Sequence, residues 1–340
     1  MRIDMHFHSK FSDGRLTAVE IIELAKQKWA GFIACTEHDV INTEFPKLAR
    51  EAGFKSVEAV EISWKDRKYD KHLHFTCYAQ KFSQEVHEVL DSSRAWRQDK
   101  MRAQISLLQW HWFIIDWKNF LEFYRERWVN VDNFNSSHLS SYVYMQDTNI
   151  ALVEKLTGEK LDRDWFVKNC LKDEWRYPWI WAVLMPEYEP SIEKCSEMAR
   201  DNNAILSLAH PNFKLTQNQF RERIAYYLEL GINAVEINAK ANKSWVDLIL
   251  EYREKLGYIL TFWSDCHFKE NDDNEHWEFL AINPFISEQM ISLNNYYIQK
   301  KLWILPTLNI PESFRDDLWA DILEYAKTLK EYSRTPVFES

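Results

Sequence analysis

The chain opens with the stretch Arg2-Ile3-Asp4-Met5-His6-Phe7-His8, in which a short predicted strand, Arg2–His6, leads into two histidines. Side chains at positions i and i+2 of a strand point to the same face, so His6 and His8 can contact one metal ion. An acidic residue, Asp13, follows five residues later. A lone His-x-His pair also arises by chance in strands, so this stretch indicates a metal site only if similar residues recur at the ends of other strands.

Strands and helices alternate along two parts of the chain. Thr17 and Glu20 form a predicted capping box for a helix that runs to about Trp29. Apolar runs predict further strands, and amphipathic segments that end at glycines predict further helices. The strands are expected at 32–36, 56–63, 73–79, 205–209, 233–238 and 259–264, and the helices at 44–52, 217–230 and 244–256. Repeated β–α units predict a mainly parallel sheet that is closed or nearly closed.

The chain divides into three predicted parts. Residues 1–82 and 190–285 carry the alternation and form the predicted barrel domain, and residues 286–340 form a C-terminal extension that packs on it. Residues 83–189 have a helical pattern and hold nine of the 16 tryptophans, which indicates a helical insertion. Most of these tryptophans are expected to pack the insertion onto the barrel; the alternative is that one or two stack on a base.

The composition is that of a globular protein with a net negative charge. Among 340 residues, 42 Lys and Arg stand against 52 Asp and Glu, which excludes a protein that coats nucleic acid by charge alone. There is no apolar run near the roughly 18 residues that a membrane span needs. Because the histidine motif starts at once, no signal peptide is expected and a cytoplasmic location is the simplest interpretation. The five cysteines have no CxxC spacing and are expected to be reduced thiols.

Histidines and carboxylates recur at the ends of the predicted strands. In a parallel barrel the carboxyl ends of the strands meet at one face, so residues far apart in sequence can share a site. Imidazoles mixed with carboxylates favour zinc, manganese or iron over magnesium or calcium, and the candidates exceed the need of one ion. They are His6, His8, Asp13, His38, Asp39, Glu61, His72, His74, His138, His210, Asp265 and His267.

The order of these motifs resembles the polymerase and histidinol phosphatase (PHP) family of metal-dependent phosphoesterases, most of all its stand-alone nucleotide phosphatase and nuclease members. The resemblance covers residues 1–270, and the insertion aligns least well. It rests on the HxH pair, Asp13-Gly14, Thr36-x-His38-Asp39, Glu61, a histidine on the next strand, His210-Pro211 and Ser264-Asp265-x-His267. It implies an α/β fold, namely a distorted (β/α)7 barrel with a helical insertion, and three divalent metal ions (manganese, zinc or iron).

The resemblance also implies which residues hold each ion. The first ion would be held by His6, His8, Glu61 and Asp265, the second by Glu61, His74 and His138, and the third by Asp13, His38 and His267. Two ions together can lower the pKa of a bridging water, which gives a hydroxide that attacks phosphorus. In this interpretation Glu61 bridges two ions, His210 protonates the leaving oxygen or supports a ligand, and Asp39 orients a ligand.

The substrate end of the site departs from the family pattern. The stretch Asn135-Ser136-Ser137-His138-Leu139 replaces the usual Arg-Pro-His-Ile-Ala, so Ser136 stands where a basic residue commonly contacts phosphate. Phosphate is therefore expected to be held differently, or the substrate is not the usual one. The cationic candidates are Arg94, Arg97, Arg102 and Lys214, although a solvated helix face also explains most of the arginines.

The leading hypothesis is a metal-dependent phosphoric ester hydrolase that acts on a phosphomonoester, either a nucleotide or another small phosphorylated metabolite. One alternative is an exonuclease of the same family that trims DNA or RNA ends, and another is a catalytically silent module that binds a partner. The full set of ligand positions favours an enzyme over the silent module, and the net acidity argues against the nuclease. No membrane contact and no obligatory protein partner is predicted.

Overall fold

The computed structural model describes residues 2–66, 68–69, 71–127, 129–171, 190–268 and 278–302. The chain separates into two compact units, 1–302 and 303–340, and all described residues belong to the first. The C-terminal extension beyond residue 302 therefore lies outside the described residues. The division of the chain into three domains stays a prediction.

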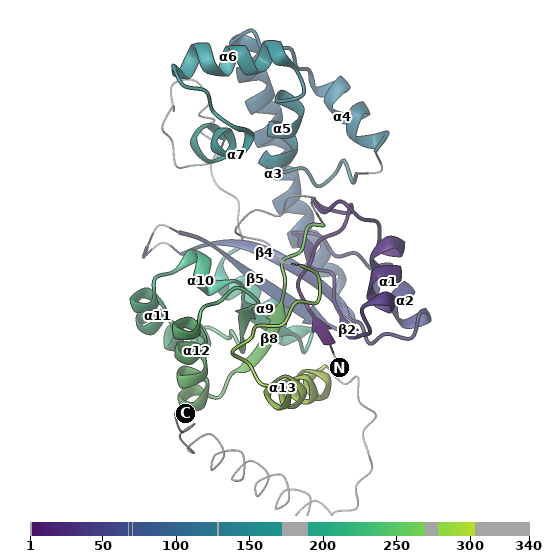
Figure 1. Cartoon of the computed structure of the whole chain (residues 1–340), viewed down its shortest axis with the longest axis vertical. Helices are drawn as coiled ribbons and strands as arrows, with labels where there is room; N and C mark the ends of the chain where they lie inside the picture. The colour runs from purple at the N-terminus through teal and green to yellow at the C-terminus, as the bar shows by residue number, and fades with distance from the viewer. Residues whose placement is uncertain are drawn as a thin grey trace, which may run out of the picture. The chain divides into compact units, whose positions relative to one another are not determined.

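The strands form two sheets (Figure 1). In the smaller sheet, β1 (Arg2–Asp4) pairs in parallel with β2 (Ala30–Ile33). The larger sheet has the order β3 (Glu37–His38), β4 (Glu58–Asp66), β5 (Lys71–Ala79), β6 (Ile205–Leu208), β7 (Ala234–Asn238) and β8 (Ile259–Trp263). β5 runs antiparallel to β4 and to β6, whereas the other pairs are parallel. The prediction of a mainly parallel sheet is thus correct for all pairs except the two that β5 makes.

Backbone hydrogen bonds link the two sheets. The Met5 N–H donates to the Phe262 carbonyl at 3.0 Å, which joins the end of β1 to β8. Within the larger sheet, the Asp39 N–H donates to the Glu61 carbonyl at 2.8 Å, just beyond the pairing of β3 with β4. The described residues therefore form a mixed α/β fold in which β1, β3, β4 and β8 end close together. Closure into a (β/α)7 barrel stays a prediction.

Four helices of the alternating parts begin and end close to the predicted positions, namely α1 (Ala18–Gln27), α2 (Phe45–Glu51), α11 (Gln217–Glu229) and α12 (Lys243–Leu256). Three further helices were not predicted: α9 (Ile192–Asp201), α10 (Pro211–Lys214) and, in the C-terminal extension, α13 (Glu288–Lys301). The predicted capping box of Thr17 and Glu20 is confirmed at the start of α1. The expected end of α1 at Trp29 is wrong by two residues, because Trp29 takes a left-handed conformation (φ 58°) that cannot continue a helix.

Helices α3 to α7 share a hydrophobic core of their own within the predicted insertion. They are α3 (Gln84–Trp110), α4 (Trp117–Arg125), α5 (Ser136–Val143), α6 (Asp147–Thr157) and α7 (Arg163–Phe166), followed by a π-helical turn, Val167–Leu171. Phenylalanine and tyrosine dominate the aromatic part of this core, and Trp117 packs against it. Trp110, Trp112 and Trp165 are instead 73%, 83% and 46% exposed, so the expectation that most tryptophans pack the insertion onto the barrel does not hold for these three.

All five cysteines lie in the described part of the chain, where they are buried and form no disulfide, in agreement with the prediction of reduced thiols. Within the part of the chain that the structure describes, no helix combines the length and the apolar character that crossing a membrane requires.

Candidate metal centre

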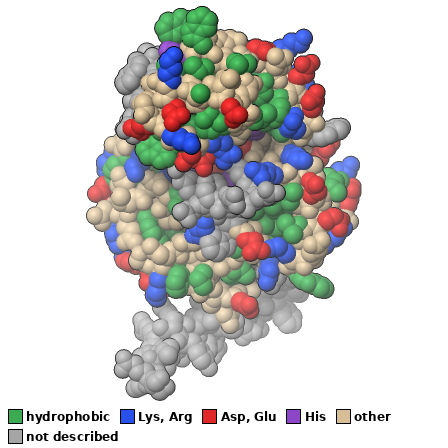
Figure 2. Space-filling view, turned by 45° about the horizontal axis from the view of Figure 1, so that its top comes forward, with side chains coloured by type: hydrophobic (Ala, Val, Ile, Leu, Met, Phe, Trp, Pro, Cys, Tyr) green, Lys and Arg blue, Asp and Glu red, His purple; other side chains and the backbone are tan. Residues whose placement is uncertain are grey.

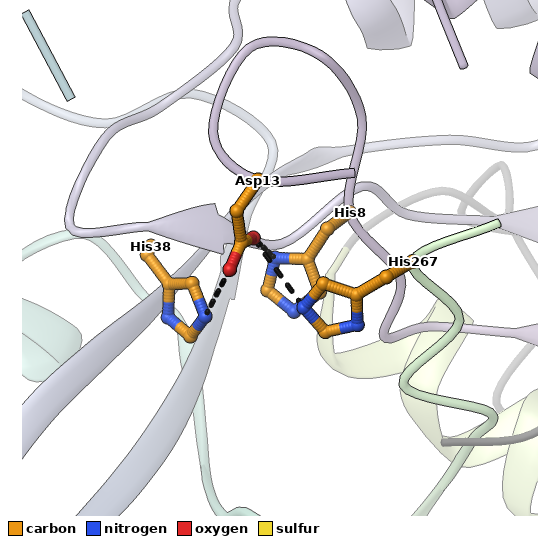
Figure 3. A group of neighbouring side chains, drawn as sticks. All are labelled: His8, Asp13, His38 and His267. Carbon is orange, nitrogen blue, oxygen red and sulfur yellow. Dashed lines mark ion pairs between the residues drawn. The ribbon is translucent and has the colours of Figure 1, made fainter. Parts of the chain in front are cut away.

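One cluster of side chains gathers around Asp13 (Figure 3). The Oδ1 atom of Asp13 lies 3.3 Å from His267 Nε2 and 3.7 Å from His8 Nδ1, and its Oδ2 atom lies 3.7 Å from His38 Nε2. These residues follow β1, belong to β3 and follow β8, so the convergence of strand ends brings them together. The structure thus gathers Asp13, His38 and His267, the three residues expected at the third ion, and adds His8.

A second cluster joins the His-x-His pair to Glu61 on β4. Glu61 Oε2 lies 3.4 Å from the Nε2 atoms of both His6 and His8. Asp265 Oδ1 lies 3.2 Å from His8 Nε2 and 3.5 Å from His6 Nε2. All four residues expected at the first ion therefore lie within reach of one another.

A third cluster places histidines against both oxygens of Glu61. His74 Nδ1, on β5, lies 2.7 Å from Glu61 Oε1, and His38 Nδ1 lies 2.9 Å from Glu61 Oε2. His210 Nε2 lies 2.9 Å from Glu61 Oε1 and 3.1 Å from His74 Nδ1. Glu61 thus contacts histidines of every cluster, as expected of a residue that bridges two ions.

The donor atoms fit divalent metal ions. His6 is 0% exposed, yet its Nε2 atom has no hydrogen-bond partner among the described residues. Buried polar atoms are rarely left without a partner, because an unpaired one costs about 1–3 kcal/mol. Since the set consists of imidazole nitrogens and carboxylate oxygens, it suits zinc, manganese or iron.

Electrostatics in the centre favour cations. Burial disfavours charge on both His38 and Glu61, but their mutual attraction outweighs it. Glu61 and Asp13 raise the pKa of His38 to about 9, and the neighbouring histidines hold the pKa of Glu61 well below its usual range. His74 behaves differently, because burial and the positive charges nearby lower its pKa to about 3 despite Glu61.

Metal binding should therefore release protons. With a pKa of about 9, His38 in the metal-free chain carries a proton at neutral pH, and a metal ion has to displace it. We expect metal affinity to rise with pH up to about 9. Calorimetric titration with Mn²⁺ at neutral pH, in two buffers of different ionisation enthalpy, measures the protons released. Equal heats in both buffers would contradict this expectation, and His38→Asn should release fewer protons than the unaltered chain.

The structure leaves two predicted site residues outside these clusters. Within the described residues, the possible metal groups do not include His138, whose Nδ1 accepts from the Asn135 N–H at 3.2 Å in the capping of α5. Asp39 is buried, pairs with Arg97 at 3.1 Å and accepts from the Ser63 N–H at 3.1 Å. Asp39 thus anchors the insertion helix α3 to the end of β3.

The predicted substrate-binding cations separate into two sets. Arg94 and Arg97 reach the β3 end, where Arg94 donates to the Asp39 carbonyl at 3.3 Å. Lys214, at the end of α10, is close enough that its charge lowers the pKa of His74. Arg102 instead pairs with Asp99 at 3.3 Å and lies over the Trp117 ring, an arrangement that belongs to the insertion surface.

The insertion meets the metal centre through asparagines that the sequence did not single out. Asn135, the N-cap of α5, donates from Nδ2 to Asp13 Oδ2 at 2.8 Å, and Asn133 donates to the His38 carbonyl at 2.8 Å. Ser136 is the first residue of α5 and therefore lies next to this contact. In the sequence, Asn133 and Asn135 stand out only because they lie a few residues before His138.

Two buried glutamates behind the ligands were also missed. Glu236 on β7 contacts His6 Nδ1, and Glu37 on β3 accepts hydrogen bonds from Ser9 and Ser12 in the loop that carries Asp13. Both are 0% exposed. A glutamate inside an apolar strand such as Ala234-Val235-Glu236-Ile237-Asn238 is a signal that could have found the first of them.

By sequence, part of this chain is similar to a known phosphatase. No family model matches the chain. A 3',5'-nucleoside bisphosphate phosphatase from Chromobacterium violaceum is 34% identical over 73 residues, which is 21% of this chain and only 26% of the relative. The chain thus matches about a quarter of that protein's length.

Solved structures extend the similarity over most of the chain. A candidate metal-dependent phosphoesterase from Bifidobacterium adolescentis has a TM-score of 0.62 at 17% identity, covering 88% of this chain and 96% of that one. An amidohydrolase from Chromobacterium violaceum, solved with sulfate and no metal, has a TM-score of 0.63 at 19% identity, covering 87% and 96%. The predicted resemblance to PHP-type metal-dependent phosphoesterases is thereby confirmed at the level of the fold.

Proposed function

We propose that this chain is a metal-dependent phosphoric ester hydrolase that releases phosphate from a nucleotide or another small phosphorylated metabolite. The observation that carries the proposal is the position of Glu61, whose carboxylate lies within 3.4 Å of His6, His8, His38 and His74. A carboxylate shared by several imidazoles is what two adjacent metal ions require of a bridging ligand. The fold of the relatives and the name of the bisphosphate phosphatase support the same reaction class.

The three clusters would hold up to three ions, at the end of a distorted (β/α)7 barrel. Bound divalent ions would activate water for in-line attack on phosphorus and offset the charge on the phosphate oxygens. Glu61 would join the first two sites, and Asp13 would anchor the third with His38 and His267. Lys214, whose charge lowers the pKa of His74, and Arg97, which donates to the His38 carbonyl at 3.4 Å, are the candidates for holding the substrate.

His210 is the candidate proton donor to the leaving oxygen. Its ring is buried beside Glu61 and His74, and its backbone takes a strained left-handed conformation (φ 33°) at the start of α10. Non-glycine residues keep such a conformation only where the surrounding structure enforces it, and such strain is concentrated at functional sites. A proton donor in this position needs no mobile segment to reach the reacting bond.

The described part of the surface in Figure 2 bears on the exonuclease alternative. On the face drawn in Figure 2, acidic and basic side chains are interspersed among apolar ones. A protein that tracks a nucleic-acid backbone usually offers a continuous cationic surface. On this face of the molecule, small substrates are therefore favoured.

A substrate panel with Mn²⁺ tests the proposal. We expect phosphate release from 3',5'-nucleoside bisphosphates and from simpler phosphomonoesters such as histidinol phosphate, because ions held in these clusters would bind phosphate oxygens. End-labelled oligonucleotides serve as the comparison. Shortening of the oligonucleotides without phosphate release from any monoester would refute the phosphatase and leave the exonuclease.

A further inference from the structure

Glu236 lies beneath the metal centre, fully buried on β7. Its two carboxylate oxygens each lie 3.2 Å from His6 Nδ1. It also accepts hydrogen bonds from the Thr76 hydroxyl at 2.6 Å, the Tyr78 hydroxyl at 3.4 Å and the His210 N–H at 3.0 Å. Four donors from β1, β5 and the β6–α10 turn therefore converge on this carboxylate, and they match the acceptor capacity of its ionised form.

The contact with His6 decides which ring nitrogen faces the metal centre. A carboxylate in hydrogen-bond contact requires a proton on Nδ1, so the lone pair of the neutral ring lies on Nε2. That Nε2 atom is the buried one without a hydrogen-bond partner, and it lies 3.4 Å from Glu61 and 3.5 Å from Asp265. Trp263 stacks against the face of the His6 ring, with the two ring centroids 5.1 Å apart.

The contact with His210 fixes a strained backbone. His210 has φ 33°, and its N–H points to Glu236 Oε2 while its ring reaches Glu61. Strain of this kind persists only where neighbouring contacts offset it. The hydrogen bond from the His210 N–H to the Glu236 carboxylate holds the backbone of this turn.

From these contacts we infer that Glu236 is the positioning residue of the metal centre: it fixes the tautomer of His6 and the turn of His210 together. It does not touch the metal ions or the substrate. Its loss should weaken metal binding at the His6 cluster and displace His210, although every ligand remains in the sequence. The inference rests on the proposed metal centre, but it concerns metal binding and not the reaction.

Glu236→Gln tests this role with metal affinity as the readout. The amide has one acceptor oxygen and one donor nitrogen, so it can no longer accept from all four donors, and it permits the wrong tautomer of His6. We expect the dissociation constant for Mn²⁺ at the tightest site to rise by about 10–100-fold. Glu236→Asp, which keeps the charge but draws it back by one methylene, should lie between Gln and the unaltered chain.

Glu58→Gln is the matched control, because Glu58 is also a buried glutamate of the sheet and accepts from the Phe82 N–H at 2.7 Å outside the metal clusters. It should leave metal affinity unchanged. Unchanged affinity in Glu236→Gln, or an equal loss in Glu58→Gln, would overturn the inference. If the Glu236 variants do not fold, nitrogen-15 spectra of the zinc-loaded unaltered chain decide, because they must show His6 with a protonated Nδ1 and a metal-bound Nε2. Metal binding without phosphate release would refute the proposed function and leave this inference standing.

Discussion

Replacing Glu61 by glutamine should lower phosphate release by about a thousandfold or more, equivalent to ~4 kcal/mol of the activation barrier. Glu61 belongs to two of the three clusters, and its two oxygens contact five histidines: His6, His8, His38, His74 and His210. The amide cannot bridge two cations, because it lacks the charge and has only one oxygen. The loss should appear in kcat, since the chemistry and not substrate capture depends on the bridge.

The fold should survive this change. Glutamine has the same shape as glutamate. In the metal-free chain it also replaces a buried carboxylate, which burial deprives of solvation by water, with a neutral amide. Thermal unfolding of the metal-free variant gives the control, and Glu58→Gln on the same strand controls for a buried carboxylate elsewhere. Retained turnover in a folded Glu61→Gln chain that still binds metal would mean that the bridge is not needed for the reaction.

Removal of the metal ions should abolish phosphate release altogether, and Mn²⁺ should restore it. Within the described residues, the imidazoles and carboxylates of the centre contact one another, and His38, whose pKa Glu61 and Asp13 raise to about 9 against the effect of burial, carries a proton at neutral pH in the metal-free state. Chelation is therefore expected to leave a protonated centre that cannot activate water. Activity that persists after exhaustive chelation, checked by elemental analysis, would contradict this expectation.

Local patterns in the sequence predicted much of the fold correctly. The capping box at Thr17 and the alternation of strands and helices depend on neighbours within a few residues, so they are legible without the structure. The antiparallel course of β5 was not predicted, because a strand's direction depends on partners far along the chain. The exposed Trp110 and Trp112 were also missed, since large apolar residues are ordinarily expected in a core.

The candidate site could be predicted from the sequence where the ligands lie at or just after the ends of strands. His6, His8, Asp13, His38, Asp265 and His267 each contact another member of the set, as the convergence of strand ends predicts. Glu61 and His74 reach the site from the middle of β4 and β5 instead. His138 lies on an insertion helix, where no such rule applies, and its role stays a prediction. Asn135 and Glu236 act through contacts between residues more than 100 positions apart, which no local pattern indicates.

The number of metal ions bound when activity saturates tests the central claim most directly. Metal-free chain is titrated with Mn²⁺, and bound metal and phosphate release from a nucleoside bisphosphate are measured in the same samples. Because the three clusters share Glu61, His8 and His38, the account predicts that release appears only once at least two ions are bound per chain. Full phosphate release at less than one ion per chain would contradict it.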